Sequence, residues 1–205
     1  MKNLAITFLM LATTFSAWAE VEKTMYFVEP MLSYEKSTGS VEYPAPFESS
    51  DFDAAGFGAG ARVGMRLYEY VLLGFEGRYS ILTFEDTITD DGNNASSWNY
   101  GPMIGAQLPS KYPVRLWASY ILGSHLDLDE DSNEVDLKYT DGTGYRLGVG
   151  VKLKAIYLNL EYQVLSYRTV EVESVGNSIT DVSADVDNDA KTWVLSASYP
   201  FEFGF

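Results

Sequence analysis

The single histidine, His125, is the residue best suited to acid–base chemistry, and it stands next to Ser124 and two positions before Asp127. Histidine can activate a serine nucleophile for hydrolysis or acyl transfer when the two side chains meet. Neighbouring side chains of an extended strand, however, point to opposite faces. The chain also has no Gly-x-Ser-x-Gly motif. We therefore expect no catalytic residue and no enzymatic activity, and we keep a lipid-modifying enzyme that uses His125 as the second alternative function.

Aspartates at alternate positions suggest another kind of site, because carboxylate oxygens are the ligands that calcium prefers. They occur in two runs, 127–131 and 185–189. An EF-hand loop also needs glycine at its sixth position and glutamate at its twelfth. The first run has serine and lysine there, and the second has alanine and serine. We expect no dedicated metal site and no cofactor, and we leave weak binding of a divalent cation open.

The composition narrows the classes of protein further. The 205 residues carry a formal charge of −15 with a pI near 4.3, so nucleic acid is not an expected partner. There is no cysteine, which excludes disulfides and thiolate sites. Of the 29 acidic residues, 21 fall in four stretches, 36–54, 83–97, 124–143 and 169–190. We expect these stretches to be solvated, and they are the candidate contacts for a basic extracellular ligand or a divalent cation.

The rest of the chain alternates apolar and polar residues with a period of two, which is typical of strands. Eight strands of about the length that crosses a bilayer are expected at 25–35, 56–67, 71–82, 98–108, 114–123, 144–153, 156–167 and 192–205. Short turns at 68–70, 109–113 and 154–155 alternate with the four acidic stretches. This layout predicts an all-β fold, an eight-stranded antiparallel up-and-down transmembrane β-barrel with four long acidic extracellular loops. A soluble barrel, with its apolar faces inside, is the alternative. The apolar faces of the strands carry no charge along their whole length, which favours a barrel whose outer surface contacts lipid.

Three prolines conflict with uninterrupted strands. Pro30, Pro102 and Pro200 fall inside the expected strands, and a closed barrel has no free edge to accommodate them. We expect bulges or shortened pairing at these positions.

The polar faces of the strands carry most of the arginines and several glutamates. If the turn at 68–70 sets a register in which paired residue numbers sum to 138, Arg62 lies across from Glu76. A lone charge in a narrow lumen is costly, so we predict an ion pair there. The predicted lumenal charge network consists of Arg62, Glu76, Arg78, Arg146 and Glu161. Since an eight-stranded barrel is just wide enough for side chains to fill, we expect a plug rather than a pore.

The two ends of the chain carry export features. Residues 1–19 combine a positive start, an apolar stretch and alanines at positions 17 and 19, so we expect a signal peptide followed by a mature barrel at 20–205. At the other end, aromatic residues stand at alternate positions: Tyr199, Phe201, Phe203 and Phe205. This pattern resembles the assembly signal of bacterial outer-membrane barrels. The whole layout is similar to the small eight-stranded family that includes the OmpA membrane domain, OmpX and OmpW.

The resemblance implies a place in the cell outer membrane of a Gram-negative bacterium, reached from the periplasm. The implied partners are outer-membrane lipid and lipopolysaccharide, together with the outer-membrane assembly machinery, and we expect a monomer. For the function we expect a structural or surface-interaction role, that is, adhesion or ligand binding through the loops. The first alternative is a narrow channel or transporter for small solutes or apolar compounds.

Overall fold

A computed structural model of the chain describes residues 24–42, 49–86, 92–108, 110–129, 135–175 and 178–204. The strands in this part are β1 (Thr24–Glu42), β2 (Ser50–Leu67), β3 (Val71–Asp86), β4 (Gly92–Leu108), β5 (Val114–Leu128), β6 (Val135–Leu153), β7 (Ile156–Val175), β8 (Ser178–Ser198) and β9 (Phe201–Gly204). In the described residues, no helix has the length and the apolar character of a transmembrane span.

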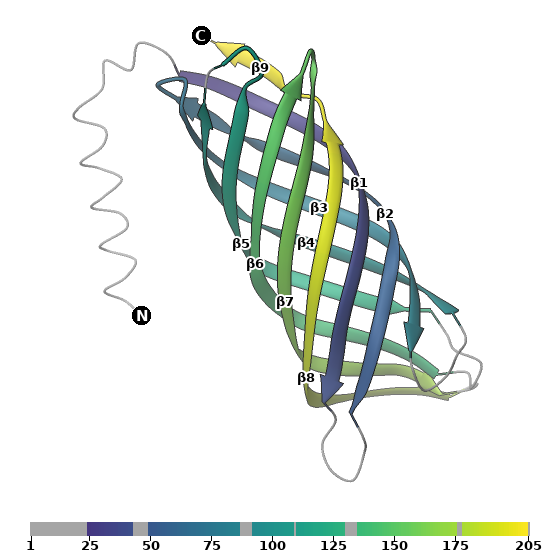
Figure 1. Cartoon of the computed structure of the whole chain (residues 1–205). Helices are drawn as coiled ribbons and strands as arrows, with labels where there is room; N and C mark the ends of the chain where they lie inside the picture. The colour runs from purple at the N-terminus through teal and green to yellow at the C-terminus, as the bar shows by residue number, and fades with distance from the viewer. Residues whose placement is uncertain are drawn as a thin grey trace, which may run out of the picture.

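The strands close into a barrel in which neighbours in sequence are neighbours in space (Figure 1). Every pair is antiparallel, from β1–β2 to β7–β8. β1 closes the ring, because its other edge pairs first with β8 and then with β9. Since β9 prolongs the line of β8 along β1, the wall has eight strand positions. The eight-stranded antiparallel up-and-down barrel predicted from the sequence is confirmed.

The prolines mark interruptions in the wall. Tyr199 and Pro200 separate β8 from β9, and the residues of β1 that face this break are Glu29 and Pro30. The Tyr199 N–H donates to the Pro30 carbonyl oxygen across the break, at 3.1 Å. Between β4 and β5 the register shifts around Pro102. Irregular pairing therefore occurs where the sequence predicts it, because proline has no N–H to donate to the sheet.

The strands are longer than predicted at one end of the barrel. β1 to β8 contain 15 to 21 residues each, and they take up most of the stretches predicted as loops. The segments between strands at this end, which we call the loop end, are 43–49, 87–91, 129–134 and 176–177. The opposite end, with the turns at 68–70, 109–113 and 154–155, is the turn end. The predicted loop boundaries are therefore wrong, and 176–177 is as short as a turn.

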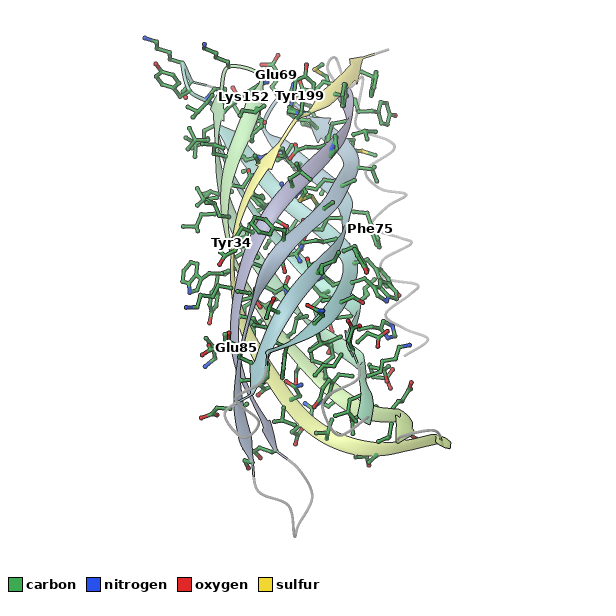
Figure 2. All side chains as sticks on the ribbon, turned by 90° about the vertical axis from the view of Figure 1, so that its right-hand side faces the viewer. Tyr34, Glu69, Phe75, Glu85, Lys152 and Tyr199 are labelled. Carbon is green, nitrogen blue, oxygen red and sulfur yellow. The ribbon has the colours of Figure 1, made fainter. Side chains whose placement is uncertain are left out.

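A reversal of the inside–outside pattern explains this difference. In the middle of the barrel the outward residues are apolar and the inward residues polar, whereas near the loop end the two exchange places. Along β8 the outward side changes from Leu195 to Asp187, while the inward side changes from Ser196 to Val186. Figure 2 shows Glu85 on the outside near the loop end. The acidic stretches are thus strand with a water-facing exterior and an apolar interior.

Candidate functional site

Charged side chains gather inside the middle of the barrel. Within the described residues, the buried charged side chains are four glutamates and four arginines, none more than 4% exposed. We call them the lumenal network: Glu29, Glu35, Glu76, Glu161, Arg62, Arg78, Arg115 and Arg146. Their formal charges cancel. This balance matters because a buried charge without a partner is strongly destabilising.

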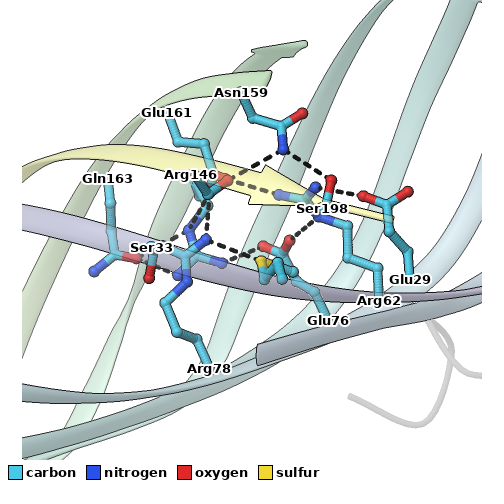
Figure 3. A network of polar contacts seen from close by, with 12 residues as sticks. Glu29, Ser33, Arg62, Glu76, Arg78, Arg146, Asn159, Glu161, Gln163 and Ser198 are labelled. Atoms are coloured by element: carbon cyan, nitrogen blue, oxygen red, sulfur yellow. Dashed lines mark hydrogen bonds and ion pairs between the residues drawn. The ribbon is translucent and has the colours of Figure 1, made fainter. Parts of the chain in front are cut away.

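Arg62 pairs with three of the four glutamates of this network (Figure 3). Its Nε donates to Glu76 Oε2 at 3.0 Å, its Nη1 to Glu29 Oε1 at 3.1 Å and its Nη2 to Glu161 Oε1 at 2.9 Å. Strands β2 and β3 pair Arg62 directly with Glu76, in the register derived from the turn at 68–70. One guanidinium thus joins carboxylates from β1, β3 and β7, so it cross-links distant parts of the wall.

Glu161 and Arg146 extend the network across the lumen. Glu161 Oε2 accepts a hydrogen bond from Arg78 Nη2 at 2.6 Å. Arg146 Nη1 donates to Glu76 Oε1 at 2.5 Å, and Arg146 also donates to the side-chain carbonyl of Gln163. The structure therefore brings together the five residues singled out in the sequence: Arg62, Glu76, Arg78, Arg146 and Glu161.

Three members of the network were not among the predicted residues. Arg115 Nη1 donates to Glu29 Oε2 at 2.6 Å, and Arg78 Nη1 donates to Glu35 Oε1 at 3.4 Å. Glu29 and Glu35 share the odd-numbered, inward parity of β1, and Arg115 stands on the polar face of β5. Parity alone could have found all three, but it does not say which distant strand supplies the partner.

A small apolar cluster packs in the lumen toward the turn end, beside Arg62 and Arg115 of the network. It consists of Phe27, Leu72, Met103 and Trp117. The guanidinium carbon of Arg62 lies 4.3 Å from the centroid of the Trp117 ring, which is a cation–π contact. Gly148 makes room for this ring, because a Cβ at that position would overlap the indole.

A larger apolar cluster fills the lumen on the loop side. We call it the loop-end cluster, and its larger members include Phe52, Phe84, Leu128, Tyr139 and Tyr167. The β7–β8 hairpin curves across the loop end (Figure 1) and adds Val170 and Val186 to the cluster. Between this cluster and the network is a cavity of about 20 Å³, room for about one water molecule. Apolar and charged side chains therefore fill most of the lumen.

Acidic side chains line the outside of the barrel at the loop end. We call them the acidic collar: Glu42, Asp51, Asp53, Glu85, Asp127, Asp129, Asp141, Glu171, Asp185, Asp187 and Asp189. Basic side chains lie beside some of them: Arg168 Nη1 is 2.5 Å from Asp187 Oδ1, and Lys138 Nζ is 3.9 Å from Asp127 Oδ2. Both pairs are solvent-exposed, so neither holds its carboxylate firmly.

The aspartate runs do not form a metal centre in the part of the chain that the structure describes. There, His, Cys, Asp and Glu side chains form no group of three or more that could hold a metal ion. Asp185, Asp187 and Asp189 all point outward from β8, about 6–7 Å apart along the strand. Asp131 of the other run lies outside the described residues.

Ser124 and His125 face opposite sides of the wall. The Ser124 hydroxyl is fully buried and shares a hydrogen bond of 2.9 Å with the Tyr167 hydroxyl in the lumen. The His125 ring stacks on Trp98 outside the barrel, with ring centroids 4.7 Å apart and planes at 15°. The serine and the imidazole therefore point away from each other, as expected for neighbours in a strand.

The C-terminal aromatic residues lie on the outer surface. Tyr199, Phe201 and Phe203 are 44%, 49% and 51% exposed, and they follow one another along the outside of β9 and the break before it. Phe205 lies outside the described residues, as does the predicted signal peptide at 1–19. The role of this aromatic row in assembly stays a prediction.

Several solved structures are similar to this chain at low sequence identity. Neisserial surface protein A is 13% identical, over 86% of this chain and 97% of that one, with a TM-score of 0.45. AlkL is 11% identical, over 85% and 90%, with a TM-score of 0.49. OprG from Pseudomonas aeruginosa is 10% identical, over 86% and 95%, with a TM-score of 0.48.

The sequence itself matches a family model over almost its whole length. None of the curated proteins compared with the chain matches it. The family model, described as the outer membrane protein beta-barrel domain, matches residues 5–201. The exposed apolar side chains around the middle of the barrel, among them Leu32, Phe57, Ile81 and Leu195, are then the surface that meets lipid. The chain therefore belongs to the outer membrane protein beta-barrel domain family, and its place is the outer membrane.

Proposed function

We propose that this protein is a non-enzymatic, non-conducting outer-membrane barrel that works as a monomer through its exterior at the loop end. Its role is structural and interactive: the barrel anchors the acidic collar above the membrane, outside the cell, where the collar attracts basic ligands. The observation that supports this proposal is that side chains fill the lumen: a charge-balanced network and two apolar clusters occupy it.

The closed lumen argues against the channel alternative. A water-filled pore needs a continuous polar path, and here Phe27, Leu72, Met103 and Trp117 on one side and the loop-end cluster on the other lie across that path. Apolar constrictions resist hydration. The cavity between the network and the loop-end cluster, about 20 Å³, is too small for a solute larger than water.

The collar favours a basic partner. Its carboxylates project outward from seven of the eight long strands, all near one end of the barrel, and few basic residues lie among them. Such a concentration of one sign of charge produces a potential that speeds association with the opposite charge, and salt weakens it. The second alternative, a lipid-modifying enzyme, has no support in the geometry of Ser124 and His125, which face opposite sides of the wall.

The test is binding of poly-L-lysine to the refolded protein in nanodiscs of zwitterionic lipid. The wild type should bind at low salt and release the polymer between about 0.05 and 0.5 M NaCl, as screening lengths shorten. The variant Asp51→Asn/Asp53→Asn/Asp189→Asn should bind more weakly, while Glu69→Gln, at the turn end, serves as the control. Equal binding by the wild type and the triple variant would contradict the proposal.

A further inference from the structure

Two lysines stand at the boundary between the lipid-facing band and the acidic collar. Lys36 of β1 and Lys191 of β8 both point outward and are exposed. β1 and β8 pair Lys36 with Trp193 and Lys191 with Thr38, so the two lysines are diagonal neighbours on adjacent strands. Such neighbours lie about 7–8 Å apart, a gap that two flexible ammonium groups can close around one phosphate. Within the described residues neither lysine has an ion-pair partner.

Aromatic and apolar side chains continue this face toward the turn end. Trp193 and Tyr34 are the next outward residues after the lysines in the direction of the turn end, and they are 56% and 44% exposed. Aromatic rings of this kind take the level of lipid headgroups in membrane barrels. Leu195 and Leu32 come next toward the turn end. They are 60% and 70% exposed and belong to the band that meets lipid.

A groove of about 380 Å³ opens in the same face, where small residues and the break between β8 and β9 leave space. It is lined mainly by Pro30, Leu32, Ala59, Ile156, Ala197 and Tyr199. Leu32 lies four residues from Lys36, about 13 Å along β1. The half-thickness of the hydrocarbon core is about 15 Å, so one lipid molecule can reach both the lysines and the groove.

The geometry points to a binding site for lipid A, the phosphorylated glycolipid part of lipopolysaccharide, on the outer face of β8, β1 and β2. A phosphate binds between Lys36 and Lys191, the sugar backbone lies beside Trp193 and Tyr34, and one acyl chain fills the groove. The acidic collar limits how far the phosphate can lie toward the loop end, because Asp189 and Asp51, in the next row of side chains, repel it there. Asp53, across Thr38 from Lys191, limits the site on the side of β2. The assignment rests on the loop end facing outside the cell.

The test uses the refolded full chain in neutral detergent micelles, titrated with bisphosphorylated lipid A and followed by native mass spectrometry. Lys36→Gln/Lys191→Gln should bind lipid A at least tenfold more weakly than the wild type, since two charge-assisted contacts are lost. Lys111→Gln/Lys154→Gln changes the charge equally at the turn end and should bind like the wild type. Ala59→Leu/Ala197→Leu fills the groove and should also weaken binding. Folding of each variant is checked by the heat-dependent change of mobility on gels.

Two further ligands distinguish lipid A from a phospholipid as the molecule that supplies the phosphate. Dephosphorylated lipid A should bind the wild type no better than it binds the lysine variant. Phosphatidylglycerol, a phosphate-bearing lipid without the sugar backbone, should not displace lipid A at equal concentration. Unchanged lipid A binding by Lys36→Gln/Lys191→Gln, or equal binding of dephosphorylated lipid A, would overturn the proposal. Displacement by phosphatidylglycerol would assign the face to phospholipid instead.

Discussion

Replacing Glu161 by glutamine tests the lumenal network where it is most connected. The Glu161 carboxylate is fully buried and accepts hydrogen bonds from Arg62 Nη2 at 2.9 Å, Arg78 Nη2 at 2.6 Å and Ser196 Oγ at 2.8 Å. Glutamine has nearly the same volume, so it leaves no cavity. It does remove one negative charge from a set of four glutamates and four arginines.

The expected cost follows from that imbalance. Removing one partner of a buried ion pair typically costs about 3–5 kcal/mol, because the remaining charge is left in a medium that solvates it poorly. The cavity of about 20 Å³ in the lumen is lined by Glu35 and Gln163 but not by Glu161, and it has room for about one water molecule, so water compensates little. We expect Glu161→Gln to lower the free energy of unfolding by about 3–5 kcal/mol. The double variant Glu161→Gln/Arg78→Gln restores the balance and should lose less than the sum of the two single variants.

The assay is equilibrium unfolding in urea of the protein refolded into lipid vesicles, followed by tryptophan fluorescence. Glu202→Gln is the matched control, because its partner Arg66 lies 2.7 Å away in a pair at the turn end that is partly open to water. That variant should lower the free energy of unfolding by about 1 kcal/mol or less. If Glu161→Gln were no more destabilising than Glu202→Gln, the reasoning about charge balance would be refuted.

Three further predictions concern other parts of the barrel. Gly148→Leu should destabilise the fold by about 1–3 kcal/mol in the same urea assay, because its side chain overlaps the Trp117 indole; unchanged stability would mean that the ring has another place to go. Phe203→Ser should reduce the amount of folded protein in cell envelopes, seen as less heat-modifiable protein on gels, if the C-terminal aromatic row guides assembly; wild-type levels would argue against that role. His125→Ala should leave the mass spectrum of lipid A from expressing cells unchanged, whereas a lost modification would reveal an enzyme.

The fold was predictable because one physical rule governs most of each strand. A barrel wall between lipid and a packed lumen requires alternation, and Arg62, Arg78 and Arg146 all stand on the polar side of that alternation. The tight turn at 68–70 then fixes the register of β2 against β3, and with it the position of Glu76 opposite Arg62. Local spacing was therefore sufficient for contacts within a hairpin.

The ends of the strands were not predictable by the same rule. Beyond Trp193, the outward residues of β8 are Lys191 and then aspartates, so a search for apolar outward residues stops although the strand continues. The sequence still alternates there, since Val186 and Ala190 alternate with Asp185, Asp187 and Asp189. The apolar residues, however, face inward and the charged residues outward, as in a barrel surrounded by water. The partners of Arg62 on β1 and β7 were also beyond reach, because they depend on how the closed barrel brings distant strands together.

Single-channel conductance of the refolded protein in planar bilayers, with insertion verified independently, tests the central claim most directly. A lumen closed by the charge-balanced network and by apolar clusters on both sides predicts no steps of current above the bilayer background. Stable and reproducible openings from inserted wild-type protein would contradict the closed lumen, and transport would then replace surface interaction as the proposed function.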